Sequence, residues 1–344
     1  MAAILVVGLL VAVVVSRRGP PALGIPWRLQ AGSALVGAAQ LEGGDLFVAT
    51  RDGTVVAAAA GSGDPRWRFE TGERLQAAPV VGGGLMYVAT EVGESGSASL
   101  FAVDARTGTE QWGATVDVPI TGQLVLDGGL VYVPAGDVVA FDALTGEERW
   151  RAAPGTGVVS VTAGSGAVVV TGTSGLTALD GLTGDERWTV PTAGLLPVAP
   201  AMAGEGVIAG DGGGHLVGRD LSDGAERWRA PDAGLVQPPV VAGPLIVLPT
   251  SDGVVALSSS TGEQRWEREL NGDPAGDDTV RVASDGVAVA ATSGGELTLL
   301  HATTGEVLGA AHLDGEVPAT PAVADGRVYV AQGETVTAFD RRAG

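Results

Sequence analysis

The stretch Ala140-Phe141-Asp142-Ala143-Leu144-Thr145-Gly146, followed by Trp150, indicates the fold of this 344-residue chain because it recurs. The near copies are Ala102–Gly108 before Trp112 and Ala178–Gly184 before Trp188. A phrase that returns at a period of roughly 20–50 residues is the signature of a repeat architecture. The recurrence therefore predicts a chain built from a series of similar units.

Tryptophan marks each unit at a spacing of 38 to 45 residues. The tryptophans are Trp27, Trp67, Trp112, Trp150, Trp188, Trp228 and Trp266. Looser copies of the phrase end at Gly63, Gly224 and Gly262. Another copy closes at Gly305 but has Gly309 in place of the tryptophan, and we expect a weaker junction there. With Gly344 as the last closing glycine, the count is eight units.

Each unit contains four short runs typical of β-strands. In the third unit these are Gly122–Val125, Leu130–Val133, Val138–Phe141 and the run that starts at Trp150. Asp, Thr and Gly between the last two are typical turn residues. Four strands in about 40 residues are typical of a propeller blade. Glycine density and β-branched runs exclude helical repeats, and the Gly-His and Trp-Asp signatures of WD40 blades are missing. We predict an all-β, eight-bladed β-propeller.

The two ends of the repeat region complement one another. The last copy, Ala338 to Gly344, has no tryptophan after it, whereas Trp27 has no Asp-x-x-Thr-Gly phrase before it. The sequence therefore predicts that the N-terminal strand completes the last blade, which removes open sheet edges. The predicted propeller covers residues 27–344, and residues 19–26 form a linker.

Residues 1–18 read as a short transmembrane or signal-like helix. The apolar run Ala2–Val15 is shorter than the ~20 residues that a spanning helix needs. Arg17 and Arg18 follow this run, and the positive-inside rule would place the domain in the cytoplasm. An open reading frame that starts upstream of Met1 would lengthen the helix. We expect a membrane anchor with the domain on the extracytoplasmic side, in the periplasm or at the cell surface; a cleaved signal and a cytoplasmic domain are the alternatives.

The phrase Ala-x-Asp-x-x-Thr-Gly-x-x-x-Trp resembles the tryptophan-docking repeat of pyrroloquinoline-quinone (PQQ) dehydrogenases. It also resembles the repeat of the eight-bladed lipoprotein that serves the outer-membrane β-barrel assembly machine. Large aromatic rings between sheets bury apolar area, and each indole N–H needs an acceptor, which a turn carbonyl of the next blade can provide. We expect structural roles for Trp27, Trp67, Trp112, Trp150, Trp188, Trp228, Trp266, Asp104, Asp142, Asp180, Asp340, Gly108, Gly146 and Gly184.

Composition excludes several kinds of function. Asp and Glu number 40 against 20 basic residues, all of them Arg, and the net charge is −20. We therefore expect no nucleic acid as a partner, because binding it would require a basic face. The chain has no Cys, which excludes disulfides and thiolate metal sites.

No catalytic residue and no cofactor-binding residue can be assigned from the sequence. The resemblance implies that quinone enzymes of this family use PQQ, a Ca²⁺-like ion and long insertions. The insertions of this chain are short, so no cofactor is expected and PQQ remains the alternative. Asp273, Asp277 and Asp278 are weak candidates for a Ca²⁺ site, but a solvated turn is the preferred interpretation. The histidines, which define no zinc set or nucleophile triad, are His215, His301 and His312.

A binding module is the favoured function class. We expect a monomeric, membrane-anchored propeller that acts as a scaffold or sensor in the cell envelope, with envelope or membrane proteins as partners. A PQQ-dependent dehydrogenase and an envelope carbohydrate binder are the alternatives.

Overall fold

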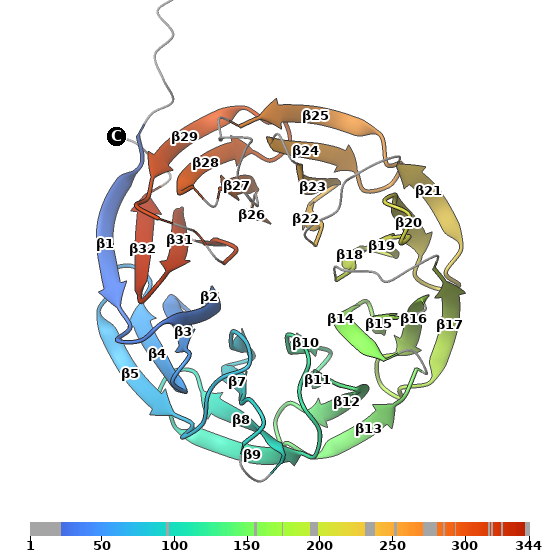
Figure 1. The fold of residues 1–344 in the computed structure, drawn as a ribbon, viewed down its shortest axis with the longest axis horizontal. Helices are drawn as coiled ribbons and strands as arrows, with labels where there is room; N and C mark the ends of the chain where they lie inside the picture. Colours follow the sequence, from blue (N-terminus) through green and yellow to red (C-terminus); the bar gives the residue numbers. More distant parts are fainter. Residues whose placement is uncertain are drawn as a thin grey trace, which may run out of the picture.

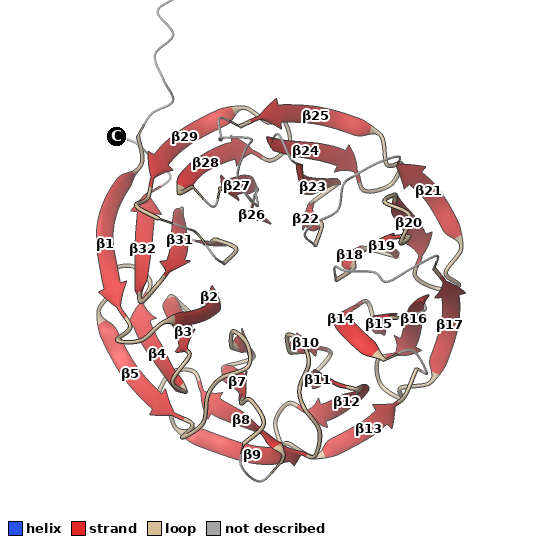
Figure 2. Ribbon diagram, in the orientation of Figure 1, coloured by secondary structure: helices blue, strands red, loops and turns tan. Residues whose placement is uncertain are grey.

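A computed structural model describes thirteen segments of the chain. These are residues 22–93, 96–154, 157–173, 175–192, 199–230, 238–250, 253–270, 281–284, 286–292, 294–315, 317, 319–324 and 326–340. Within them the strands form eight four-stranded antiparallel sheets. Figures 1 and 2 show the sheets arranged radially around a central axis, so the predicted eight-bladed propeller is confirmed.

Blades 1 to 4 each consist of four consecutive strands, from the axis outward. Blade 1 contains β2 (Leu35–Glu42), β3 (Asp45–Thr50), β4 (Thr54–Ala59) and β5 (Pro65–Glu70). Blade 2 contains β6 (Val80–Gly82), β7 (Leu85–Ala89), β8 (Ala98–Asp104) and β9 (Glu110–Val116). Blade 3 contains β10 (Val125–Asp127), β11 (Leu130–Ala135), β12 (Asp137–Asp142) and β13 (Glu148–Ala152). Blade 4 contains β14 (Val158–Gly164), β15 (Ala167–Gly172), β16 (Gly175–Asp180) and β17 (Glu186–Pro191).

Blades 5 to 7 repeat this order, and blade 8 joins the two ends of the repeat region. Blade 5 contains β18 (Ala201–Ala203), β19 (Gly206–Gly210), β20 (Leu216–Asp220) and β21 (Glu226–Ala230). Blade 6 contains β22 (Val240–Ala242), β23 (Leu245–Thr250), β24 (Gly253–Ser258) and β25 (Gln264–Glu269). Blade 7 contains β26 (Arg281–Ser284), β27 (Val287–Ala291), β28 (Glu296–His301) and β29 (Val307–His312). Blade 8 contains β30 (Ala322–Ala324), β31 (Arg327–Gln332), β32 (Thr335–Asp340) and β1 (Gly24–Gln30).

The ring closes through β1, which is the outermost strand of blade 8 (Figure 1). Trp27 lies opposite Ala338, and Gly24 lies opposite Asp340. The first strand thus begins at Gly24, inside the segment that was predicted to be a linker. The expected pairing of the Trp27 segment with the last repeat is present for Asp340, whereas residues 341–344 lie outside the described residues.

In every blade except blade 7, one aromatic or aliphatic residue, one small residue and one tryptophan form a row across the three outer strands. In blade 3 the row is Tyr132, Ala140 and Trp150. A β-bulge follows at once, because Trp150 pairs with Ala140 while Glu148 pairs with Phe141. Bulges increase strand twist and redirect side chains. The small residue is needed because it lies between two large rings.

Eight hydrophobic clusters form the core, and each one joins two neighbouring blades. The cluster between blades 3 and 4, for example, contains Tyr132, Val138, Val168 and Leu179. The same pairing of adjacent sheets describes the other clusters. Apolar burial therefore stabilises junctions between neighbours, as in other repeat architectures.

The predicted helix at residues 1–18 lies outside the described residues, and so do Asp273, Asp277 and Asp278. Among the residues that are described, no helix has the length and apolar character needed to span a membrane.

Candidate functional site

Each tryptophan lies on the outermost strand of its blade and donates its indole N–H to a turn carbonyl of the next blade. Trp150 Nε1 is 3.0 Å from Gly181 O. The other six pairs are Trp27 with Ala60, Trp67 with Ala105, Trp112 with Ala143, Trp188 with Leu221, Trp228 with Ser259 and Trp266 with Ala302, at 2.9–3.2 Å. A desolvated N–H without an acceptor would cost free energy, so this bond orients the ring.

In the turns of blades 1 to 7, the closing glycine lies directly under the tryptophan of the preceding blade. The φ of Gly184 is +76°, a value that favours glycine. A Cβ at Gly184 would lie 2.6 Å from Cε3 of Trp150, and a Cβ at Gly146 would lie 2.6 Å from Cδ2 of Trp112. Glycine is therefore required both by the turn and by the close approach of the indole.

Three junctions have a second donor to the same carbonyl. Tyr132 Oη donates to Gly181 O at 3.1 Å, beside the Trp150 bond. Its ring centroid lies 5.8 Å from that of Trp150. The other two pairs are Tyr87 with Trp112 on Ala143 O and Tyr329 with Trp27 on Ala60 O. Burial, with nearby carboxylates, raises the pKa of Tyr87 and Tyr132 to about 12. The tyrosines of blades 2, 3 and 8 therefore each add a hydrogen bond to a turn of the next blade, in blades 3, 4 and 1.

In blades 3, 4 and 5 the aspartate of the repeat caps its own turn and pairs with the arginine before the tryptophan. Asp142 Oδ1 accepts the backbone N–H of Leu144 and of Thr145, both at 2.9 Å. Arg149 donates to Asp142 Oδ2 at 2.7 Å. The Arg149 guanidinium, and then the Thr145 N–H, hold the pKa of Asp142 at about 2. The same turn is built around Asp104 and Asp180, whereas Asp340 pairs with Arg327 at 2.8 Å.

Blade 7 departs from this pattern. Gly309 occupies the tryptophan position and pairs with Leu299, where the other blades have alanine or glycine. Leu299 is fully buried, so the apolar volume has moved to the neighbouring strand. Leu23 joins the same cluster and donates its N–H to Ala310 O at 3.1 Å. Aliphatic side chains therefore fill the junction of blades 7 and 8; its weakness stays a prediction.

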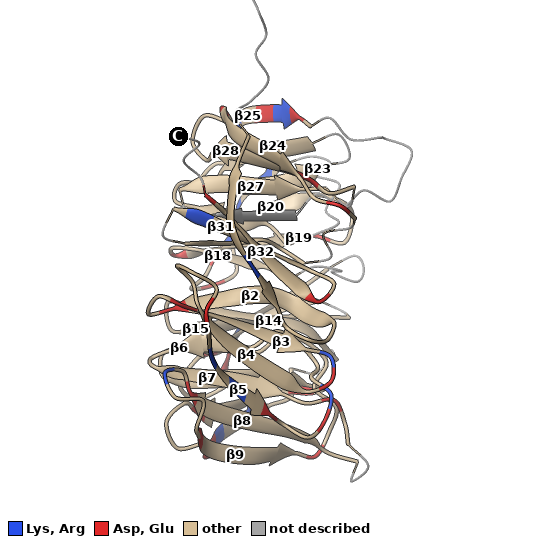
Figure 3. Cartoon of the chain, turned by 90° about the vertical axis from the view of Figure 1, so that its left-hand side faces the viewer, with Lys and Arg blue, Asp and Glu red and all other residues tan. Residues whose placement is uncertain are grey.

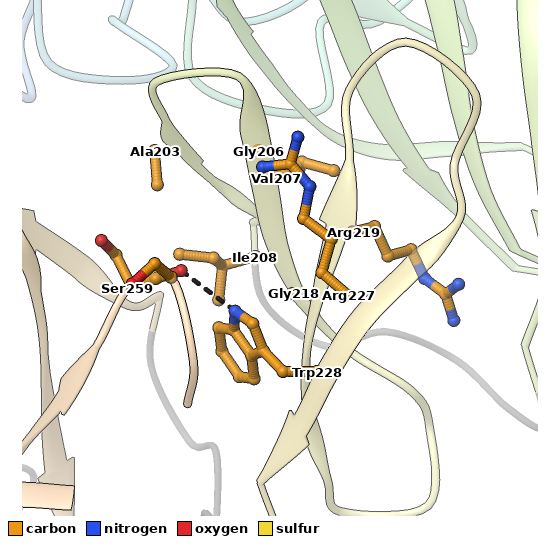
Figure 4. A pocket seen from close by; sticks show the side chains of 10 residues that line it. Ala203, Gly206, Val207, Ile208, Gly218, Arg219, Arg227, Trp228 and Ser259 are labelled. Atoms are coloured by element: carbon orange, nitrogen blue, oxygen red, sulfur yellow. Dashed lines mark hydrogen bonds between the residues drawn. The ribbon is translucent and has the colours of Figure 1, made fainter. Parts of the chain in front are cut away.

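Two junctions that lack the tyrosine contain cavities. In blade 5 the tyrosine position is Ile208, and a cavity of about 80 Å³ remains between Ile208, Gly218, Trp228 and Ser259 (Figure 4). Trp228 still donates to Ser259 O at 3.0 Å (Figure 4). The indole of Trp228 packs directly over Gly218, at the position where the other tryptophan-bearing blades have alanine.

The second cavity, of about 300 Å³, lies at the junction of blades 1 and 2, where Phe47 replaces the tyrosine. Glu42, Asp45 and Arg106 border it. Oε1 of Glu42 accepts the Gly84 N–H at 3.3 Å, whereas its Oε2 is buried without a hydrogen-bond partner in the described part of the chain.

The histidines lie apart from one another. His215 Nδ1 is 2.9 Å from Asp211 Oδ2, which also pairs with Arg229. Burial raises the pKa of Asp211, but backbone N–H donors and these side chains outweigh it and hold the pKa at about 2. His312 pairs with Glu296 at 2.9 Å. The backbone of His301 follows the turn geometry of the repeat aspartate. The His215 pair was visible in the sequence as an i, i+4 spacing across the glycine hairpin, and sequence reasoning missed it.

The inner strands differ in their polar side chains. Strands β6, β18, β22 and β30 consist of Val, Ala, Met and Gly, whereas β2, β10 and β14 contain Gln40, Glu42, Asp127, Ser160 and Thr162. Figure 3 shows charged residues mainly at turns and on outer strands such as β25. Over the described segments, no group of three His, Asp or Glu side chains is arranged to hold a metal ion. No residue can be assigned to PQQ or its ion from this geometry.

We call the row of three residues that ends in the tryptophan the docking row of its blade. The fold and these docking rows define the class of this protein: an eight-bladed β-propeller in which the tryptophan of one blade binds a turn of the next. The profile of the family described as outer membrane protein assembly factor BamB matches residues 24–112, 96–234 and 250–344. These segments make up most of the chain, and the chain therefore belongs to this family. No curated protein matches the sequence.

Several solved structures share the fold. BamB from Moraxella catarrhalis is 19% identical, with a TM-score of 0.73 over 92% of this chain and 99% of that chain. The computationally designed Ika8 protein is 17% identical, with a TM-score of 0.74 over 94% and 100%. Quinohemoprotein alcohol dehydrogenase from Comamonas testosteroni is 16% identical, with a TM-score of 0.69 over 93% and 76%. At these identities the likeness concerns the fold alone.

Proposed function

We propose that this protein is a non-catalytic scaffold of the cell envelope that binds other envelope or membrane proteins through the rims of its propeller. The observation that carries the proposal is the match of the BamB family along residues 24–344, with a gap only at 235–249. In this reading the docking rows keep the ring rigid, and the turns at its rims present side chains to partners. Rigid presentation reduces the entropy that a complex loses on forming.

A quinone-dependent dehydrogenase is the second candidate, because two quinohemoprotein alcohol dehydrogenases share the fold. This chain covers 76% of each of them, so a quarter of each enzyme has no counterpart here. A carbohydrate binder of the envelope remains a third candidate, without a specific observation in its favour.

The experiment that separates these candidates uses the full-length chain purified with its N-terminal segment. Incubation with PQQ and Ca²⁺, followed by absorbance spectroscopy and a dye-linked alcohol oxidation assay, should give no retained cofactor and no turnover. Affinity isolation from membranes of the producing cell should recover a defined protein. Retained PQQ with alcohol oxidation would overturn the proposal in favour of the dehydrogenase.

We further propose that residues 1–18 anchor the propeller to the membrane with the domain on the extracytoplasmic side, as the family name suggests for an outer-membrane assembly factor. Protease added to intact spheroplasts should then digest the propeller. Protection until the membrane is lysed would place the domain in the cytoplasm instead.

A further inference from the structure

Two leucines are far more exposed than any other large apolar side chain described. Leu144 is 75% exposed and Leu182 is 73% exposed, whereas Ile25, the next, is 45% exposed. Both occupy the same position of the repeat turn, in the neighbouring blades 3 and 4. Equivalent turns of neighbouring blades lie on the same rim, and apolar surface exposed on one rim is a candidate interaction site.

The turn itself does not require leucine at this position. The equivalent residues in other blades are Gly61, Arg106, Ser222, Ser260 and Thr303. Turns with these residues keep the same backbone pattern, in which the glycine N–H donates to the carbonyl four residues earlier. Folding therefore does not explain why blades 3 and 4 expose leucine.

The two turns are also among the most firmly held on this rim. Ala143 O, next to Leu144, accepts both an indole N–H and a tyrosine hydroxyl. Gly181 O, next to Leu182, accepts the same two kinds of donor. Asp142 and Asp180 accept the backbone N–H of the leucines at 2.9 and 3.0 Å. The leucines are therefore presented from a fixed backbone, which favours binding.

The surroundings of the leucines are acidic. Segments 142–151 and 180–188 contain six carboxylates and three arginines. Arg149 and Arg187 are paired with the aspartates of their own turns, at 2.7 and 2.8 Å. Glu147, Asp185 and Glu186 are exposed and follow the leucines by three or four residues in the sequence. Carboxylates around an apolar contact favour a partner whose rim is basic.

We propose that Leu144 and Leu182, with Glu147, Asp185 and Glu186, form a docking surface for a protein that offers apolar sockets framed by Lys or Arg. A second copy of this chain fits poorly, because its net charge of −20 would oppose the acidic rim. An anionic lipid surface is disfavoured for the same reason. This inference rests on the proposed scaffold function and names the surface that performs it.

The test compares three variants of the full-length chain with wild type. L144S/L182S removes the apolar contacts, E147Q/D185N/E186Q removes the charges, and T303S is the matched control on the same turn position of blade 7. Because all these side chains are exposed, the melting temperature of each variant should equal that of wild type. Each chain serves as bait in detergent extracts of the producing cell's membranes, at low and high salt.

The expected result is a polypeptide that wild type and T303S recover and that both other variants lose. Once purified, that polypeptide should bind wild type in titration calorimetry, more weakly at high salt, and should bind L144S/L182S about tenfold or more weakly. Equal binding to L144S/L182S would overturn the docking surface and leave the scaffold function standing. Recovery of no partner by wild type would overturn both.

Two other outcomes would also overturn this inference. One is flotation of wild type, but not L144S/L182S, with phosphatidylglycerol vesicles, which would identify lipid as the occupant. The other is a dimer of wild type that L144S/L182S abolishes in light scattering, which would identify a second copy.

Discussion

Replacing Ile208 by Tyr should stabilise the protein, because it adds to blade 5 the tyrosine that the rows of blades 2, 3 and 8 contain. The cavity of about 80 Å³ lies between Ile208, Trp228 and Ser259. In blade 3 the equivalent Tyr132 contacts its tryptophan at 5.8 Å between centroids and donates to the shared carbonyl at 3.1 Å. A tyrosine at 208 should form the same two contacts with Trp228 and Ser259 O.

The expected gain follows from these two contacts. A net buried hydrogen bond contributes about 1 kcal/mol, and an aromatic pair about 0.5–1.5 kcal/mol. The rotamer entropy that the longer side chain loses offsets part of this. I208Y should therefore raise the free energy of unfolding by about 1–2 kcal/mol. The reverse change, Y132I, loses both contacts and leaves a cavity, and should lower it by about 2–3 kcal/mol.

Guanidinium unfolding followed by tryptophan fluorescence measures these changes, and hydrogen exchange locates them. Because each blade contacts only its neighbours, slower exchange in I208Y should concentrate on the turn that contains Ser259 and on β19. I208F separates the two terms, since it fills the cavity without the hydroxyl. An I208Y protein no more stable than wild type would refute the reasoning, and equal stability of I208F and I208Y would refute the hydrogen-bond part.

Three further predictions concern the docking rows. W150A should lower the free energy of unfolding by about 3–5 kcal/mol, and W27A should lower it by less, because Trp150 is 8% exposed whereas Trp27 is half-buried. Equal losses of the two variants in denaturant titrations would contradict this ranking. G184A should destabilise through its φ of +76° and its contact with Trp150, and a melting temperature equal to wild type would argue against both causes. The pKa of Tyr132 in the folded protein is raised from 10.0 to about 12, so the stabilisation by this group is present below pH 10 and is lost as the pH rises toward 12. In Y132F, the free energy of unfolding should therefore fall less steeply with alkaline pH than in wild type. An identical decline in the two proteins would exclude Tyr132 as the cause.

Much of the architecture was predictable because its signal repeats along the chain. The phrase around Asp142 and Gly146, with its tryptophan four residues on, specifies a turn, a strand and a large ring, and each copy predicts the same blade. Trp27, which has no repeat phrase before it, and the last copy around Asp340, which has no tryptophan after it, also predicted how the ring closes. These features depend on local turn chemistry and on the period, which a sequence displays directly.

The tertiary structure alone decided which junctions are well filled. Whether Tyr132 and Trp150 share a carbonyl depends on Gly181, which belongs to another blade. The same holds for the cavity beside Ile208, where residues of two blades meet. The sequence by itself determined eight similar blades, their turns and their closure, because those follow from short segments that repeat. The cavities and the exposed leucines were decided by contacts between blades, because packing and solvent exposure depend on residues that are distant in the sequence.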